Sequence, residues 1–556
     1  MPHAKKPEYR CCNMQIILAS VLTETTPLGV PLRASSNASF LKKKGFKDVE
    51  LVSVLHEDAA QNAYTAELLT QKIQKHINVS KQTALFLAYT TKTIKFVIKT
   101  VELIKKQQNS ALVLICFGVE NQEQIQHCKG YEVFDYVITG EPEVSSAELL
   151  QNLHGTQKTV FITGKSAKPE DLPSPWLDGT LDPVDYNGAV WELSRGCGQK
   201  CPFCANHMER MPLPLSRLEK ELELFAKKKV PEVFVEDKVF NADKERALKL
   251  FSLIQKKLPD AHFQFKIDLD LMDKQLVRAF CALSCSLQIN LISSSPTVLK
   301  NCGMSFDKKQ FAHKIRMLND NELIFGFNLI YGLPGDTYPS FRETLDYALS
   351  LYPNHLEIHK LSLIPGTKLS ADIEKTGIRA ENEPPFHIQV SPTFSELDLL
   401  KAENLAFACT VFYTAGRAVP WFLSVIHPLK IKPSQFFSDF AEWLRCNNCA
   451  KSTGFDPFSQ PHTEIEKIQL LFLELKYEEK RLSFAFPVVK DVVCLNGALS
   501  RLFAEGEETT LRTMYHPDDI LGGSAFDVTA FAEEACAEPC TVRVFNNNGS
   551  PDFQII

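Results

Sequence analysis

The sequence predicts an α/β protein with an N-terminal doubly wound Rossmann-like domain, a central partial (β/α)6 TIM-like barrel and a C-terminal mixed α+β region. Two observations predict the first two parts: apolar runs alternate with amphipathic stretches over residues 14–164, and the same alternation starts again at Ala189. A third is the stretch 165–188, which is rich in proline, aspartate and glycine, as linkers often are. We therefore expect domains at 14–164 and 189–380, followed by an extension at 381–556.

The length and composition indicate a large globular protein. A chain of 556 residues exceeds what one hydrophobic core usually supports. The net charge of −6 argues against general nucleic-acid binding. We find no apolar stretch long enough to span a membrane, and Met14–Leu22, interrupted by Gln15 and Ser20, predicts a strand and not a signal peptide. The 16 cysteines do not reach the density of a disulfide scaffold, so a reducing, cytoplasmic compartment is expected.

The N-terminal part has the pattern of a parallel sheet that is buried on both faces, in which strands are continuous apolar runs. Such runs lie at Met14–Val21, Val49–Val54, Ala84–Ala88, Ala111–Phe117 and Tyr136–Ile138. Amphipathic stretches lie between them, at Ala34–Lys44, Thr65–His76, Thr93–Lys106 and Glu120–Cys128. In such folds, ligands bind at the carboxyl ends of the strands.

The central part contains six further strand–helix units. Strands are predicted at Ala189–Leu193, Val233–Glu236, His262–Ile267, Leu287–Ile292, Ile324–Tyr331 and Leu356–Leu363. Helices are predicted at Leu215–Lys229, Ala242–Lys257, Met272–Ala282, Asp307–Asn319 and Tyr338–Leu351. Six units predict a partial barrel, whose active site is expected in the loops at the carboxyl ends of its strands.

Three cysteines, Cys197, Cys201 and Cys204, directly follow the first of these strands with the spacing C-x3-C-x2-C. Two glycines and a proline among them argue against a helix, so we expect a loop that brings three thiolates to one point. Thiolates suit zinc and iron–sulfur clusters, but structural zinc needs four ligands and His207 is the only close candidate for the fourth. The loop favours a four-iron cluster with one open iron; a structural metal knuckle or three unrelated thiols are the alternatives.

The form C-x3-C-x-aromatic-C, with Phe203 as the aromatic residue, resembles the motif of radical S-adenosylmethionine (SAM) enzymes. The resemblance implies that Cys197, Cys201 and Cys204 hold a [4Fe–4S] cluster, and that its open iron binds the amino and carboxylate groups of S-adenosylmethionine. It also implies reductive cleavage to a 5′-deoxyadenosyl radical, with Phe203 lining the adenine. A flavodoxin or ferredoxin would donate the electron, and the substrate would be a small molecule or metabolite of unknown identity.

Two later segments resemble the same family. Glu236 and Asp237 resemble its acidic element, which implies that one of them binds the amino group of S-adenosylmethionine; a solvated acidic turn is the alternative. Asn328–Thr337, with the sequence N-L-I-Y-G-L-P-G-D-T, resembles the family's I-Y-G-L-P-G-E-T. That resemblance implies that Gly332 and Pro334 lie beside the adenine; an ordinary strand–turn–helix connection is the alternative.

One strand departs from the family's pattern. Leu287–Pro296 stands where relatives carry E-x-G-x-Q-S, and Met304 stands about where they have arginine. We therefore expect altered contacts to the ribose or the methionine carboxylate, with either atypical substrate handling or weakened activity.

The segment Phe134–Glu143, F-D-Y-V-I-T-G-E-P-E, resembles the end of the cobalamin-binding domain found ahead of many radical enzymes. This resemblance implies cobalamin as a cofactor and methyl transfer to an unactivated carbon as the reaction. The family's Asp-x-His-x-x-Gly element, which supplies a cobalt ligand, is absent, because His56 is followed by Glu57-Asp58-Ala59. Two interpretations stay open: cobalamin binds without a histidine ligand, or the domain has kept the fold and lost the cofactor.

The C-terminal part resembles the extension of a poorly characterised branch of these enzymes. Helices are expected at Ser395–Ala406, with Ser395 as the N-cap, and at Gln435–Arg445 and Thr463–Leu475. Strands are expected at Leu482–Phe486 and Val542–Phe545. Cys446, Cys449, Cys536 and Cys540 could jointly hold a second cluster or zinc, but isolated thiols are the favoured alternative.

Two other functions stay open. A methylthiotransferase that modifies RNA or protein would carry cluster cysteines in its N-terminal domain and a basic β-barrel at its end. Here the early Cys11 and Cys12 are adjacent, and the tail is acidic around Glu505–Glu508. A catalytically degenerate iron–sulfur binding or sensor protein would explain the altered fourth barrel strand and the missing cobalt ligand.

Overall fold

The computed structural model describes residues 14–56, 64–107, 112–205, 208–547 and 549–556. The chain divides into two compact units, each assembled from separate segments. The first unit comprises residues 1–288, 321–323 and 361–391, and the second comprises residues 289–320, 324–360 and 392–556. The predicted domain limits at 164, 188 and 380 stay predictions.

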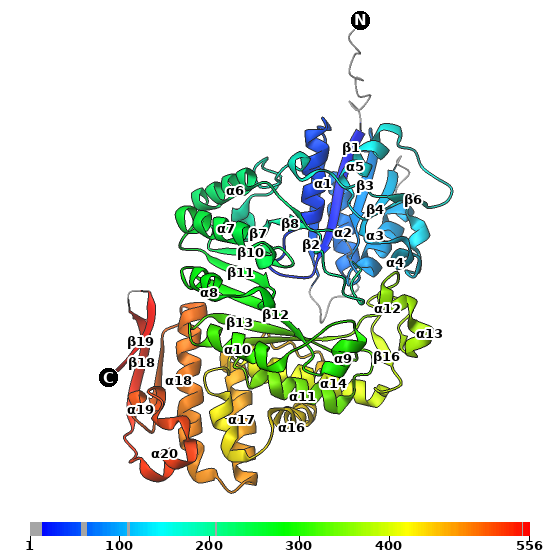
Figure 1. Cartoon of the computed structure of the whole chain (residues 1–556). Coiled ribbons are helices and arrows are strands. Elements are labelled where there is room, and N and C mark those ends of the chain that lie inside the picture. Colours follow the sequence, from blue (N-terminus) through cyan, green and yellow to red (C-terminus); the bar gives the residue numbers. More distant parts are fainter. Residues whose placement is uncertain (1–13, 57–63, 108–111, 206–207, 548) are drawn as a thin grey trace, which may run out of the picture. The chain divides into compact units, whose positions relative to one another are not determined.

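The first unit begins with a six-stranded parallel sheet in the order β2-β1-β3-β4-β5-β6 (Figure 1). Both faces of this sheet are buried: Ile17 and Ala19 of β1 join the core that α2 and α3 build, while Ile16 and Leu18 are buried on the opposite face. The predicted doubly wound sheet is therefore confirmed. Its strand order changes direction between β1 and β3, and folds of this kind bind ligands at that point.

The elements of this sheet are β1 (Met14–Leu22), α1 (Leu32–Lys43), β2 (Val49–Leu55), α2 (Tyr64–His76), β3 (Gln82–Ala88), α3 (Ile94–Gln107), β4 (Leu112–Val119), α4 (Gln122–Gln126), β5 (Tyr136–Thr139), α5 (Glu143–Leu149) and β6 (Val160–Thr163). The sequence did not predict α5 or β6, because both are short and β6 is a half-exposed edge strand.

The second sheet contains the six predicted barrel strands, in the order β14-β13-β12-β11-β10-β7. Its elements are β7 (Ala189–Glu192), β8 (Ser194–Arg195), β9 (Met211–Pro212), α6 (Leu215–Lys227), β10 (Glu232–Glu236), α7 (Lys244–Lys257), β11 (His262–Ile267), α8 (Lys274–Cys281), β12 (Cys285–Ile292), α9 (Pro296–Asn301), α10 (Lys308–Asn319), β13 (Ile324–Tyr331), α11 (Tyr338–Leu349) and β14 (His355–Lys360). The atypical strand of the sequence therefore forms β12, with alternating buried residues.

The remaining chain is mixed α and β, as predicted. It forms α12 (Lys368–Ala371), α13 (Ile373–Thr376), β15 (Arg379–Ala380), β16 (Ile388–Val390), α14 (Glu396–Cys409), α15 (Phe422–Ile426), α16 (Pro433–Cys446), α17 (His462–Glu479), α18 (Phe486–Glu505), β17 (Thr509–Thr513), α19 (Pro517–Leu521), α20 (Val528–Glu534), β18 (Cys540–Asn547) and β19 (Ser550–Ile555). The predicted cap of α14 is confirmed, because the Ser395 side chain accepts from the N–H of Asp398.

The strand predicted at Leu482–Phe486 is wrong. Residues 483–485 form a 3₁₀ turn, and Phe486 begins α18. The local alternation L-S-F-A-F is outweighed by the helical spacing that follows, since Val488, Val492 and Leu495 are buried along one helix with Pro487 in its first turn.

Helix α18 also qualifies the expectation that no stretch could span a membrane. Among the described helices, α18 is long and apolar enough to cross a membrane, but half of its apolar stretch is buried within the protein. Its buried Asp491 accepts hydrogen bonds from the N–H groups of Met514 and Tyr515, and its buried Arg501 pairs with Glu466 at 2.6 Å. These polar contacts indicate a core helix of the second unit.

Candidate functional site

The three-cysteine motif forms a loop, as predicted. The loop lies between two short paired strands. β8 and β9 are antiparallel and close the base of the loop, and residues 196–204 contain no helix. The N–H groups of Cys197 and Gly198 both donate to the carbonyl of Met208, at 3.1 and 3.2 Å. Gly196 has a φ of +73°, and a Cβ at this position would lie 2.1 Å from the carbonyl oxygen of Glu209. Only glycine therefore fits the start of this loop.

The three thiols of the loop influence one another. Burial raises the pKa of the Cys201 thiol, and Cys204 and Cys197 raise it further. The three thiols therefore lie within electrostatic range of one another. All three residues are half-buried, so the group is reachable from outside.

This donor set fits an iron–sulfur cluster better than a single metal ion. No three His, Cys, Asp or Glu side chains among the described residues are placed to hold one ion. Thiolates that hold a four-iron cluster bind separate irons and so stand further apart. His207, the fourth ligand considered for zinc, lies outside the described residues.

The two acidic residues at the end of β10 differ in their surroundings. Glu236 is half-buried, and its carboxylate contacts the ammonium groups of Lys238 at 2.6 Å and Lys266 at 3.3 Å. Burial alone would raise the pKa of Glu236, but the two lysines outweigh it and hold the pKa at about 2. Asp237 is 2% exposed and pairs with the guanidinium of Arg210. Glu236 is therefore the carboxylate that a ligand can reach.

Glu236 also lies near the cysteine loop. Burial would lower the pKa of its partner Lys238, but Glu236 raises it, and the Cys204 thiol acts in the same direction. Lys238 therefore lies within electrostatic range of Cys204. Phe203 is half-buried in the same loop, where the carbonyl of the preceding Pro202 accepts from the N–H of Leu369 at 2.8 Å.

Gly332 and Pro334 belong to the second unit and follow β13 in a tight turn. The N–H of Gly332 donates to Oδ2 of Asp336 at 3.0 Å, and the carbonyl of Pro334 accepts from the Asn301 side chain at 3.0 Å. Asp336 is buried, and burial raises the pKa of its carboxyl group to about 6, against the opposing effect of its hydrogen bonds. The predicted sharp turn is confirmed. The predicted contact with adenine stays a prediction.

The first unit has a cavity of about 380 Å³ at the carboxyl edge of its first sheet. Its lining comes from the ends of β1 and β3, from the turn after β5, and from the central strands, and includes residues 20–22, 88–90, 140–143 and 194–196 with Glu236 and Lys238. The cavity therefore lies where β1 and β3 diverge, next to the start of the cysteine loop.

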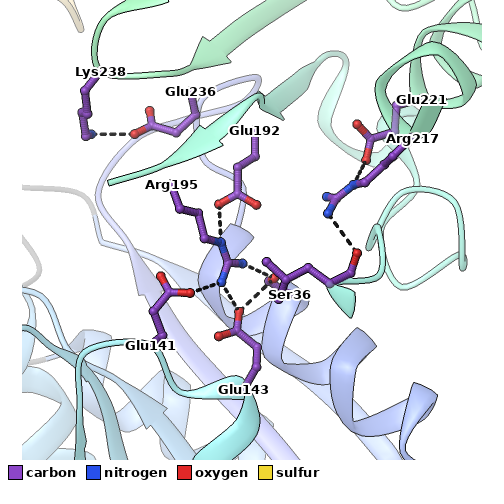
Figure 2. Close-up of polar contacts among 10 residues, drawn as sticks. Ser36, Glu141, Glu143, Glu192, Arg195, Arg217, Glu221, Glu236 and Lys238 are labelled. Atoms are coloured by element: carbon purple, nitrogen blue, oxygen red, sulfur yellow. Dashed lines mark hydrogen bonds and ion pairs between the residues drawn. The ribbon is translucent and has the colours of Figure 1, made fainter. Parts of the chain in front are cut away.

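An ionic cluster that was not predicted from the sequence lies in the wall of this cavity. Figure 2 shows the Arg195 guanidinium surrounded by Glu141, Glu143 and Glu192, with Ser36 accepting a further hydrogen bond at 2.6 Å. Burial raises the pKa of Glu141, while Arg195 opposes the shift. Glu141 and Glu143 belong to the segment 134–143, which resembles the end of a cobalamin-binding domain. Their pairing with Arg195 could not be predicted from the sequence.

His56, Cys116 and Cys128 of the N-terminal sheet region are packing residues. His56 is buried, with Nδ1 2.9 Å from Oγ1 of Thr65 and its ring 4.2 Å from that of Phe96. Cys116 and Cys128 are buried in the core of the first sheet, and burial raises the pKa of both thiols, to about 12 for Cys128. Both thiols therefore pack as small apolar groups in this core.

The second metal site that was considered as the less favoured interpretation of four C-terminal cysteines has no support among the described residues. Cys446 and Cys536 are exposed and Cys449 and Cys540 half-buried, and within the part of the chain that the structure describes no metal-binding group includes them. Cys11 and Cys12 lie outside the described residues.

Comparison with known proteins agrees with this geometry. Residues 191–348 match the model of the radical SAM superfamily. The chain is 24% identical over 323 residues to the cobalamin-dependent radical SAM methyltransferase TokK of Streptomyces tokunonensis, which covers 50% of this chain and 47% of TokK. It is 21% identical over 332 residues to the threonylcarbamoyladenosine tRNA methylthiotransferase MtaB of Thermotoga maritima, with 56% of this chain and 74% of MtaB covered. The match thus spans about half the length of TokK.

Solved structures share the fold at low identity. The cobalamin-dependent S-adenosylmethionine radical enzyme OxsB with aqua-cobalamin bound has a TM-score of 0.56 and 13% identity, covering 94% of this chain and 84% of OxsB. The radical S-adenosylmethionine methyltransferase TsrM from Kitasatospora setae, with cobalamin and a [4Fe-4S] cluster bound, has a TM-score of 0.52 and 13% identity, covering 65% and 78%.

Proposed function

We propose that this chain, in which residues 191–348 form a radical SAM domain, cleaves S-adenosylmethionine reductively at a [4Fe–4S] cluster held by Cys197, Cys201 and Cys204. The observation that carries the proposal is a loop with three half-buried thiols, whose start lines the same cavity as the reachable carboxylate of Glu236. When bound, the cluster supplies one electron that breaks the sulfonium to methionine and a 5′-deoxyadenosyl radical, which then takes a hydrogen atom from the substrate.

We assign the amino group of S-adenosylmethionine to Glu236. Its carboxylate is ionised and contacts two lysine ammonium groups, so it can accept a charge-assisted hydrogen bond from the ligand's ammonium in place of one of them. The ligand's ammonium would replace Lys238, which is the closer of the two. Asp237 keeps Arg210 in place and does not reach the ligand. Phe203, Gly332 and Pro334 are proposed to contact the adenine.

Cobalamin-linked methyl transfer is the second candidate reaction. The cavity at the divergence of β1 and β3 supports it, because this is where folds of this class bind nucleotide-like cofactors. Oε2 of the buried Glu143, on the cavity wall, has no hydrogen-bond partner in the structure, so an amide donor of a corrin would satisfy it. His56 is committed to Thr65 and Phe96, so cobalamin would bind without this histidine as a ligand.

The expected partners are an electron donor such as a flavodoxin or ferredoxin and a small-molecule substrate, with no membrane and no general nucleic-acid binding. We propose a cytoplasmic location, because a cluster of this kind needs a reducing compartment.

A methylthiotransferase function receives less support. The described cysteines of the N-terminal sheet, Cys116 and Cys128, are buried in its hydrophobic core, so they do not offer a second set of cluster ligands. The sensor alternative keeps the cluster but predicts no cleavage of S-adenosylmethionine.

Anaerobic reconstitution with iron and sulfide, followed by dithionite and S-adenosylmethionine, tests the main proposal. We expect 5′-deoxyadenosine by liquid chromatography from the wild type and none from Cys201→Ala. Cys449→Ala is the matched control, because this cysteine is also half-buried but lies outside the loop. A wild type that binds the cluster and forms no 5′-deoxyadenosine supports the sensor, and one that binds no iron overturns both.

Incubation with hydroxocobalamin tests the second candidate. Binding is expected to give a corrin absorbance that stays with the protein through gel filtration and is unchanged in His56→Phe. Loss of all corrin absorbance from the wild type would exclude cobalamin-linked methyl transfer and leave reductive cleavage standing.

A further inference from the structure

The buried guanidinium of Arg195 contacts residues of other elements that lie far away in the sequence. The side chain is 9% exposed. Its Nη1 lies 2.5 Å from Glu141 and 2.8 Å from Glu143, its Nη2 donates to Ser36, and its Nε donates to Glu192 at 3.1 Å. Arginine can contact all four partners because its planar guanidinium carries five N–H donors. The compact ammonium of a lysine cannot make the same set of contacts.

Three of these partners come from the N-terminal domain. Glu141 and Glu143 lie at the turn between β5 and α5, and Ser36 lies on α1, where its hydroxyl also donates to Glu143 at 3.1 Å. Arg195 itself ends β8, directly before the cysteine loop. One guanidinium therefore joins the carboxyl edge of the N-terminal sheet to the start of the loop (Figure 2).

The position of Arg195 in the chain makes this contact important for the thiols. Only Gly196 separates it from Cys197, and Gly196 is confined by the carbonyl of Glu209. On the other side of the loop, Arg210 is held by the buried Asp237. The loop is thus fixed at both ends by an arginine paired with buried carboxylates, and between these two points its backbone is held by the Met208 carbonyl.

We propose that Arg195 is a positioning residue, which ties the cysteine loop to Glu141 and Glu143 of the N-terminal domain and so holds Cys197 where the cluster forms. This inference rests on the proposed function. It gives the N-terminal domain a role that does not depend on cobalamin: the sheet supports the radical site, and a chain that had lost the cobalt ligand would still need the sheet.

The test compares Arg195→Lys with Arg217→Lys as a matched control. Arg217 is also nearly buried, pairs with the buried Glu221 at 2.9 Å and donates to the carbonyl of Leu172, but it lies on α6, away from the loop (Figure 2). We expect both variants to melt at similar temperatures. Iron and sulfide per chain should fall at least twofold in Arg195→Lys only, and the electron paramagnetic resonance spectrum of its reduced cluster should broaden.

Glu143→Gln is the second variant, in case Arg195→Lys does not fold. It keeps the size of the side chain and removes its charge from Arg195. We expect reduced cluster loading and an altered reduction potential of the remaining cluster; a loss of general stability would lower the loading but would leave the potential of the assembled cluster unchanged. Wild-type iron content, spectrum and potential in both variants would overturn the inference while leaving the proposed function intact. A wild type without a cluster would instead overturn the proposed function.

Discussion

The Nη2 atom of Arg210 lies 2.5 Å from Oδ2 of Asp237, and this ion pair separates the roles of two adjacent carboxylates. Because Asp237 is buried and paired, only the neighbouring Glu236 presents a carboxylate to a ligand. Sequence alone treats the two as equivalent.

Glu236→Gln should weaken the binding of S-adenosylmethionine. The change removes one charged partner of a hydrogen bond, which is worth about 1.5–3 kcal/mol, so the Kd should rise about 10- to 100-fold. Equilibrium dialysis of the reconstituted protein measures this. Asp237→Asn is the comparison: it leaves Arg210 buried without its charge partner and should lower the free energy of unfolding by about 3 kcal/mol. A larger effect of Asp237→Asn than of Glu236→Gln on the Kd, at equal stability, would reverse the assignment.

Gly196→Ala should abolish cluster assembly, whereas Gly198→Ala should not. Both glycines have a φ of +73°, so alanine costs each about 1–2 kcal/mol of backbone strain. At Gly196 the new Cβ also meets the Glu209 carbonyl at 2.1 Å, whereas at Gly198 the nearest atoms are 4.0 Å away. Iron content per chain after reconstitution separates the two variants. Equal iron content would show that the backbone can yield at residue 196.

The raised pKa of Asp336 predicts a pH dependence of stability. Its carboxyl group titrates at about 6 in the folded chain, so between pH 4 and 6 the folded state holds a proton that the unfolded state has released. Stability should therefore fall as pH rises through this window, by about 3 kcal/mol for a shift of two pKa units. Urea unfolding at several pH values measures the slope.

Asp336→Asn tests whether this slope belongs to Asp336. The amide does not titrate, so that part of the slope should disappear, while stability at pH 7 also reflects the hydrogen bonds lost from Gly332 or Thr337. An unchanged slope in the variant would assign the pH dependence to other groups.

Gly335→Ala should cost more stability than Gly303→Ala. Both positions have positive φ, 78° and 67°, and both lose about 1–2 kcal/mol to backbone strain. At Gly335 the Cβ would also lie 2.4 Å from Nδ2 of Asn301, which must give up its hydrogen bond to the Pro334 carbonyl at a further cost of about 1 kcal/mol. Gly303 has no atom within 4 Å of the new Cβ. Equal losses of unfolding free energy would mean that this hydrogen bond adds nothing to the turn.

Local patterns were sufficient for most of the regular elements. The strand predicted at Ile324–Tyr331 coincides with β13, and the cap at Ser395 was correct. Parallel strands that are buried on both faces leave continuous apolar runs, and helix caps depend on residues three apart, so both can be recognised within a short window. At Leu482–Phe486 a short alternating pattern overlaps the start of a helical pattern. The alternation predicted a strand, but the much longer helix that begins at Phe486 determines the structure.

The sequence by itself determined that three cysteines stand in a loop after a strand, since glycines and a proline exclude a helix there whatever surrounds it. Only the tertiary structure decided that Arg195 meets Glu141, 54 residues earlier in the chain, and that Asp237, not Glu236, is taken by Arg210. The physical reason is that ion pairs between distant segments form wherever folding brings opposite charges together out of water, and no spacing along the chain records that meeting.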